Sequence, residues 1–255
     1  MRDEADEKRM KETRDELSWL PRPIRHVGWR LFLSLRSALQ TSHGLLDRQE
    51  FFMRAFYALS FNKIDGDYAE FGCHGGVTFA LAYHASRRIA YHCKLWGFDS
   101  FLGLPAQKVP EDEHPRWIQG TMHTELNDFH NICRKNHIPR SAYEVVPGYY
   151  DETLVNQDSS VNLPLNVCMA YVDCDLYSSA LAVLRFLLPR LKHGMILAFD
   201  DYYCWSSSQV SGERRACTEV FANNVDWRLV PYIQYGWHGM SFVTEKKGLL
   251  HSSLD

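Results

Sequence analysis

The sequence predicts an α/β protein built around an open, mostly parallel seven-stranded β-sheet with helices on both faces. From Gly66 onward, strand patterns and helix patterns alternate along the chain. The run from Leu165 to Asp173 is apolar without interruption and ends in an acid, which is typical of a strand buried on both faces. Only Tyr235–Gly239 joins the last two strands. This link is too short for a parallel crossover, so the final strand should be antiparallel.

Composition narrows the class of protein. The chain has 255 residues, which is enough for a domain with a large core. Its net charge of −3 provides no positive field, so nucleic acid is not an expected partner. The seven cysteines form no CxxC pair, which indicates reduced, buried thiols and a cytoplasmic location. No long apolar run is present and the start is heavily charged, so neither a membrane span nor a secretory signal is expected.

Residues 1–60 are predicted to form an N-terminal helical arm and cap, followed by a second domain over residues 61–255. The first twenty residues alternate acids and bases, a pattern that suits an exposed helix, and Pro21 and Pro23 end it. A second helical region is expected over residues 28–58, where apolar side chains recur.

The elements of the second domain follow from the same patterns. Strands are expected at 67–72, 94–99, 143–148, 165–173, 193–201, 227–233 and 240–245. Helices are expected at 77–88, 123–136, 178–191 and 213–223. An insertion over residues 101–121, rich in proline and charge, separates the second strand from the next helix.

Two strand ends carry the residues expected to bind a cofactor, because open α/β sheets bind ligands beyond the carboxyl ends of their strands. The first strand runs into the glycine turn Glu70–Thr78, which lets the backbone approach a ligand at a helix N-terminus. The second strand ends at Asp99, an acid that can accept hydrogen bonds from ribose hydroxyls. A nicotinamide dinucleotide and S-adenosylmethionine both fit, although the glycine spacing is not GxGxxG. A plain tight turn and a helix cap stay open as alternatives.

Three acids follow the fourth and fifth strands and predict a metal site. Asp173, Asp200 and Asp201 should meet at one edge of the sheet, where crowded carboxylates resist ionisation unless a cation joins them. Oxygen ligands suit Mg²⁺ or Mn²⁺. Helix caps and loop acids are the alternative interpretation. The histidines show no paired ligand spacing that would predict zinc, and His238, in the last hairpin, is a candidate base.

Taken together, these residues resemble the macrocin O-methyltransferase (TylF-type) family of class I S-adenosylmethionine-dependent methyltransferases. The matching motifs agree in order and spacing over about residues 50–245. They are Gly66-Asp-Tyr-Ala-Glu-Phe-Gly72, Gly97-Phe-Asp-Ser-Phe-Leu-Gly-Leu-Pro105, Val146-Pro-Gly-Tyr-Tyr-Asp-Glu-Thr-Leu154, Val172-Asp-Cys-Asp-Leu-Tyr-Ser178 and Asp200-Asp-Tyr202. Cys174, where the family usually has glycine, and Cys73-His74 in the cofactor loop depart from the pattern.

The resemblance implies a Rossmann-like methyltransferase fold, S-adenosylmethionine as cofactor, and Mg²⁺ held by Asp173, Asp200 and Asp201. It also implies a homo-oligomer and a small-molecule acceptor, a sugar or a glycosylated natural product such as an antibiotic precursor. The residues expected to bind the cofactor are Glu70, Phe71, Gly72, Gly75, Thr78, Asp99, Ser100, Phe101, Gly148 and Asp175.

The predicted reaction is transfer of the sulfonium methyl group to an acceptor hydroxyl, with Asp173 as first choice of base and His238 as second. Catechol-type relatives usually keep a lysine shortly after the first acid. Leu176-Tyr-Ser-Ser179 offers none, which favours a sugar or similar alcohol. The alternatives are a nicotinamide-dependent oxidoreductase, which leaves the three acids without a role, and a non-catalytic scaffold that keeps the fold.

Overall fold

A computed structural model of the chain describes residues 44–155 and 162–250. The predicted arm falls largely outside these residues, and its boundary near residue 60 stays a prediction. Residues 47–255 form one compact unit. Within that unit, the helix that runs over residues 44–61 buries Phe51, Phe52 and Phe56 in the core. Among the described residues, no helix has the length and apolar character that a membrane crossing needs.

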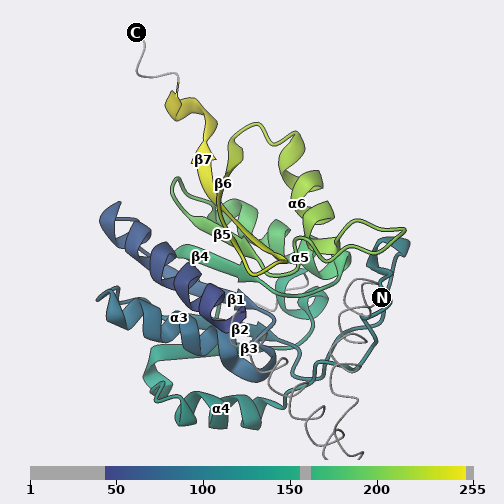
Figure 1. The fold of residues 1–255 in the computed structure, drawn as a ribbon, viewed down its shortest axis with the longest axis horizontal. Helices are drawn as coiled ribbons and strands as arrows, with labels where there is room; N and C mark the ends of the chain where they lie inside the picture. Colours follow the sequence, from purple (N-terminus) through teal and green to yellow (C-terminus); the bar gives the residue numbers. More distant parts are fainter. Residues whose placement is uncertain (1–43, 156–161, 251–255) are drawn as a thin grey trace, which may run out of the picture. The chain divides into compact units, whose positions relative to one another are not determined.

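The unit is organised around a seven-stranded sheet with the order β3-β2-β1-β4-β5-β7-β6 (Figure 1). The strands are β1 (Asp67–Phe71), β2 (Leu95–Asp99), β3 (Tyr143–Pro147), β4 (Val167–Val172), β5 (Ile196–Phe199), β6 (Trp227–Tyr235) and β7 (Gly239–Lys246). The first five are parallel, whereas β7 runs antiparallel to both β5 and β6. The predicted sheet with an antiparallel final strand is confirmed.

Helices cover both faces of the sheet, as predicted. The helix over residues 44–61 packs with α3 (Val77–Arg88) and α4 (Leu126–Lys135) on one face. The other face carries α5 (Tyr177–Leu187) and α6 (Gly212–Ala222) (Figure 1). Every residue of β4 is buried, which explains the unbroken apolar run of its sequence.

Element boundaries differ from the prediction where local chemistry ends a helix. The helix expected over residues 178–191 leaves α-geometry after Leu187 and continues as a 3₁₀ turn, Leu188–Arg190, because Pro189 lacks an N–H for the helix ladder. The helix expected from residue 123 begins at Leu126, since Glu125 adopts an extended conformation. The insertion over residues 101–121 contains one short 3₁₀ turn, Pro110–Asp112.

Candidate active site at the carboxyl ends of the strands

The register of the sheet places the predicted site residues side by side. Phe71 of β1 pairs with Phe98 of β2 on one side and with Val172 of β4 on the other, and Val172 pairs with Phe199 of β5. The residues that follow these strands therefore end at one edge. The pairing continues beyond the strands, because the Asp173 N–H donates to the Phe71 carbonyl at 2.8 Å and the Asp200 N–H donates to the Val172 carbonyl at 2.9 Å.

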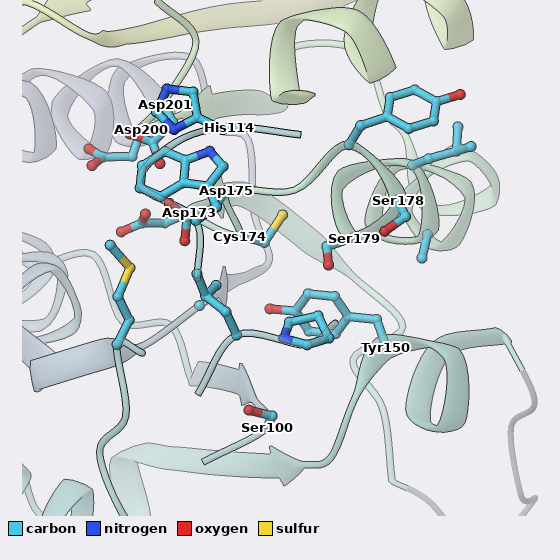
Figure 2. Close-up of a pocket in the computed structure, with 18 of the residues that line it drawn as sticks. Ser100, His114, Tyr150, Asp173, Cys174, Asp175, Ser178, Ser179, Asp200 and Asp201 are labelled. Atoms are coloured by element: carbon cyan, nitrogen blue, oxygen red, sulfur yellow. The ribbon is translucent and has the colours of Figure 1, made fainter. Parts of the chain in front are cut away.

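A cavity of about 880 Å³ opens at this edge, which is within the usual size of a ligand pocket. It is lined by most of the residues expected to act there: Gly72, Asp99, Ser100, Gly148, Asp173, Asp175, Asp200, Asp201 and His238. Figure 2 shows the four carboxyl groups of Asp173, Asp175, Asp200 and Asp201 gathered together, apart from Tyr150, Ser178 and Ser179. These predicted residues therefore share one cavity.

Five of the predicted cofactor residues do not line the cavity in the described structure. They are Glu70, Phe71, Gly75, Thr78 and Phe101. Glu70 is fully buried and accepts hydrogen bonds from the hydroxyls of Tyr68 and, at 2.8 Å, of Thr78. Burial raises the pKa of Glu70 to about 8, although these two hydrogen bonds lower it. Its side chain braces the strand and helix beneath the glycine turn.

Gly72 and Asp99 shape the part of the cavity expected to hold the cofactor. Gly72 has a φ of +93°, and a Cβ there would lie 1.7 Å from the Asp173 carbonyl oxygen, so only glycine fits. The carboxylate of Asp99 accepts the N–H of Cys73 and the N–H of Phe101, both at 2.7 Å. Each of its oxygens keeps a further lone pair for a ligand hydroxyl. Asp99 is therefore held rigidly between the two loops that flank it.

The acids of β4 and β5 crowd one another. Burial raises the pKa of Asp173, and the neighbouring carboxyls of Asp200 and Asp201 raise it further. Burial is also the largest cause that raises the pKa of Asp175. The charge of Asp201 and a hydrogen bond with Asp201 raise it further. Among the described residues, no side chain or N–H donates to the Asp173 carboxylate. Carboxylate oxygens are the ligands that a hard divalent cation such as Mg²⁺ prefers, although Asp173, Asp200 and Asp201 do not bring one oxygen each within 4.8 Å of the others in this structure.

One member of the group already has a cation partner, which the sequence did not reveal. Arg48, on the helix over residues 44–61, donates from Nε to Asp200 Oδ1 at 3.1 Å and from Nη2 to Oδ2 at 2.7 Å. Tyr171 also donates its hydroxyl to Asp200. Burial lowers the pKa of Arg48, but the hydrogen bond and charge of Asp200 outweigh this and raise it. Asp200 is therefore anchored by a cation, whereas none of the ion pairs among the described residues involves Asp173 or Asp201.

The contacts of His238 define its tautomer. Its Nδ1 lies 2.5 Å from the carbonyl oxygen of Asp200, so Nδ1 must carry the proton and donate it. Arg48 has only donors, and its Nη2 lies 3.3 Å from Nε2, which therefore accepts. Both ring nitrogens are engaged, and this arrangement argues against His238 as the base.

Glu213 is a second functional residue that sequence reasoning missed. It sits at the start of α6, is fully buried, and accepts the N–H of Cys174 at 3.1 Å and the N–H of Asp201 at 2.9 Å. Burial and Asp201 raise its pKa, against the effect of these two hydrogen bonds. One carboxylate thus ties the loop after β4 to the loop after β5.

The insertion forms a fixed wall of the cavity. Asp112 is buried and accepts the N–H of Ser178 at 2.8 Å and its hydroxyl at 3.0 Å, which caps the N-terminus of α5. Trp117 stacks on His114, with ring centroids 4.5 Å apart. Both side chains line the cavity together with Trp205 and Trp237. This wall is aromatic, and its cap on α5 holds it in place.

Comparison with known protein families shows the family to which the chain belongs. Residues 43–230 match the family model described as Macrocin-O-methyltransferase (TylF). The chain belongs to this family. It is therefore an S-adenosylmethionine-dependent O-methyltransferase, and the nicotinamide-dependent alternative is wrong. No protein with a curated description matches the sequence.

Solved structures with the same fold include two O-methyltransferases. The O-methyltransferase NovP is 20% identical, covers 78% of this chain and 80% of its own, and has a TM-score of 0.65. The calicheamicin methyltransferase CalS11 is 22% identical, covers 95% of this chain and 94% of its own, and has a TM-score of 0.58. An apo structure of CalS11, described as TDP-rhamnose 3′-O-methyltransferase, is 20% identical, covers 95% and 96%, and has a TM-score of 0.51.

Proposed function

We propose that the enzyme methylates a hydroxyl group of a sugar, or of a similar alcohol, on a natural product or glycan, with the help of a divalent cation. The observation that carries the proposal is the group of carboxyls of Asp173, Asp200 and Asp201 in one cavity beside Gly72 and Asp99. CalS11 supports the class of acceptor, since it is described as TDP-rhamnose 3′-O-methyltransferase. The aromatic wall also suits a sugar ring, whose apolar face packs on aromatic side chains. A homo-oligomer stays a prediction.

The cofactor residues supply binding and orientation. In the proposal Asp99 accepts the ribose hydroxyls of S-adenosylmethionine, since its two oxygens are fixed by the N–H groups of Cys73 and Phe101. Gly72 lines the cavity and carries no side chain, so in the proposal it faces the methionine part of the cofactor. A rigid site of this kind lowers the entropic cost of bringing the methyl carbon and the acceptor oxygen together.

The reaction balances without an oxidant or a reductant. When bound, S-adenosylmethionine would supply the methyl group: its bond between sulfur and methyl carbon would break as the acceptor oxygen bonds that carbon, S-adenosylhomocysteine would leave, and the hydroxyl proton would pass to a base. Asp173 lines the cavity with a carboxylate that no described residue holds, so it remains the proposed base. His238→Ala should then leave most of the turnover, whereas Asp173→Asn should abolish it; the opposite pattern in steady-state rates rules Asp173 out.

Asp173, Asp200 and Asp201 are the residues that would hold Mg²⁺. When bound, the cation would lower the pKa of the acceptor hydroxyl and neutralise the crowded carboxyls. Asp200 can contribute although Arg48 holds it, because a carboxylate has about four lone-pair sites and Arg48 and Tyr171 use three.

Two measurements test this proposal. Calorimetry with S-adenosylhomocysteine should show tight binding to the parent and a loss of roughly 1–3 kcal/mol in Asp99→Ala, the scale of hydrogen bonds to a charged group. Asp226→Ala, at an exposed acid, is the control and should bind like the parent. Methyl-labelled S-adenosylmethionine should then label a sugar hydroxyl when nucleotide-activated sugars and glycosylated natural products are offered. Unchanged affinity in Asp99→Ala, or label that enters only catechols, contradicts the proposal.

A further inference from the structure

A second cluster of ligating side chains lies beside the acids. One ligand atom each from Asp201, Cys204 and His238 lies within 4.8 Å of the others. Within the described part of the chain, no other three histidine, cysteine or acid side chains meet this condition. All three line the main cavity, so an ion can reach them. The cluster is distinct from the three carboxyls because it offers sulfur, nitrogen and oxygen together.

Backbone hydrogen bonds hold the cluster together. The Cys204 N–H donates to the Asp201 carbonyl at 3.0 Å, which closes a turn and brings the Cys204 Sγ to 3.0 Å from Asp201 Oδ1. The Tyr203 N–H donates to the His238 carbonyl at 2.9 Å, which ties the loop after β5 to the turn between β6 and β7. The three side chains are thus brought together by the fold.

His238 is oriented as metal-binding histidines are. Its Nδ1–H donates to a backbone carbonyl, the hydrogen bond that typically supports a ligating imidazole and leaves the lone pair on Nε2. In this structure Arg48 occupies that lone pair at 3.3 Å, a longer contact than its 2.7 Å bond to Asp200. A cation bound to Nε2 at about 2.0–2.1 Å would displace Arg48 Nη2 from the ring, and Arg48 could keep its Nε bond to Asp200 Oδ1.

We propose that Asp201, Cys204 and His238 form a second cation site, one that takes a thiophilic divalent ion of the Zn²⁺ type. Thiolate, imidazole and carboxylate are the ligands that such ions prefer, and three protein ligands leave a fourth position open to the cavity. Binding would release the thiol proton to solvent. Where Asp201 also serves the proposed Mg²⁺ site, the two ions compete for it, so the thiophilic ion inhibits methyl transfer; this consequence rests on the proposed function.

The ligand set can be tested directly with Co²⁺, which reports a sulfur ligand by a thiolate-to-cobalt charge-transfer band in the near ultraviolet. Chelator-treated, reduced protein titrated with Co²⁺ alone should develop this band, and Cys204→Ser should lose it. Cys174→Ser is the matched control, since Cys174 is the other cysteine that lines the cavity, and it should keep the band. His238→Ala should weaken Co²⁺ binding by at least the roughly 10–100-fold that loss of a supporting contact costs a metal site.

Two outcomes separate this proposal from the proposed function. Co²⁺ that binds without a charge-transfer band, or a band that survives Cys204→Ser, overturns the Cys204 site even if Mg²⁺ supports turnover. A band that depends on Cys204 in an enzyme that needs no Mg²⁺ supports the second site and contradicts the proposed role of the acids. Where both hold, Zn²⁺ should raise the Mg²⁺ concentration needed for half-maximal activity in the parent and have a much smaller effect in Cys204→Ser.

Discussion

At the scale of single residues, the acids of the site were predictable and their partners were not. Asp99, Asp173, Asp200 and Asp201 end apolar runs, and a strand end in an α/β sheet is where ligands bind. Arg48 has no comparable signal, because it lies 152 residues from Asp200 and within an ordinary helical pattern. Its role arises from packing that only the folded chain provides.

Arg48 gives the clearest prediction at this scale. Arg48→Met should destabilise the protein by about 3 kcal/mol, since it leaves Asp200 buried without its partner. Arg54→Met is the matched control on the same helix, where the ion pair with Glu50 is exposed and should contribute between about 0 and 1 kcal/mol. Urea unfolding measures both. An Arg48→Met variant as stable as Arg54→Met would show that the pair does not compensate Asp200.

At the scale of elements, the sequence predicted the strands and helices well because both faces of the sheet are buried. The expected helix over residues 77–88 coincides with α3, and every predicted strand is present. The helix expected from residue 213 is present as α6, but the contacts made by its first turn and by the insertion could not be predicted. Their key side chains, Asp112 and Glu213, accept N–H groups from other elements, and a buried acid looks like a surface acid in sequence.

Glu213 links two elements, and its effect on the metal site can be measured. Glu213→Gln keeps the size of the side chain but replaces one carboxylate oxygen with an NH₂ group. The backbone N–H of either Cys174 or Asp201 would then face a donor and lose its hydrogen bond. We expect Mn²⁺ affinity to fall roughly 10–100-fold, because groups that orient the ligands of a metal contribute on that scale.

Glu219→Gln provides the comparison for this variant. It lies on the same helix but is exposed and pairs with Arg215, so Mn²⁺ affinity should not change. Circular dichroism checks that both variants fold. Equal Mn²⁺ affinity in the parent and in Glu213→Gln, measured by electron paramagnetic resonance, would mean that Glu213 serves the fold alone.

At the scale of the whole molecule, the buried carboxyls predict how stability depends on pH. The pKa values of Glu70, Asp173, Asp175 and Glu213 are all raised in the folded protein, that of Glu70 to about 8. Above the ordinary carboxyl pKa of about 4 the unfolded chain has lost these protons while the folded chain retains them. The metal-free protein should therefore lose stability as pH rises towards about 8, by up to about 1.4 kcal/mol per unit for each such group.

Glu70→Gln isolates one part of this dependence. Its amide can still bond both the Tyr68 and Thr78 hydroxyls, and it carries no titrating proton, so the fall in stability with pH should be shallower than in the parent. Glu144→Gln is the control, because Lys94 lowers the pKa of this half-buried acid and the change should not alter the slope above about pH 5. Unfolding followed in steps of pH gives the slopes, and identical slopes for parent and Glu70→Gln contradict the assignment.

The most direct test of the central claim is a Mn²⁺ titration of the chelator-treated protein, followed by electron paramagnetic resonance. Mn²⁺ prefers oxygen ligands, so it reports the carboxyl site and not the thiol of Cys204. We expect one tightly bound ion per chain in the parent and in Cys204→Ser, and loss of that ion in Asp173→Asn and Asp201→Asn. A parent enzyme that binds no Mn²⁺, or variants at Asp173 and Asp201 that bind it as the parent does, would contradict the carboxyl metal site.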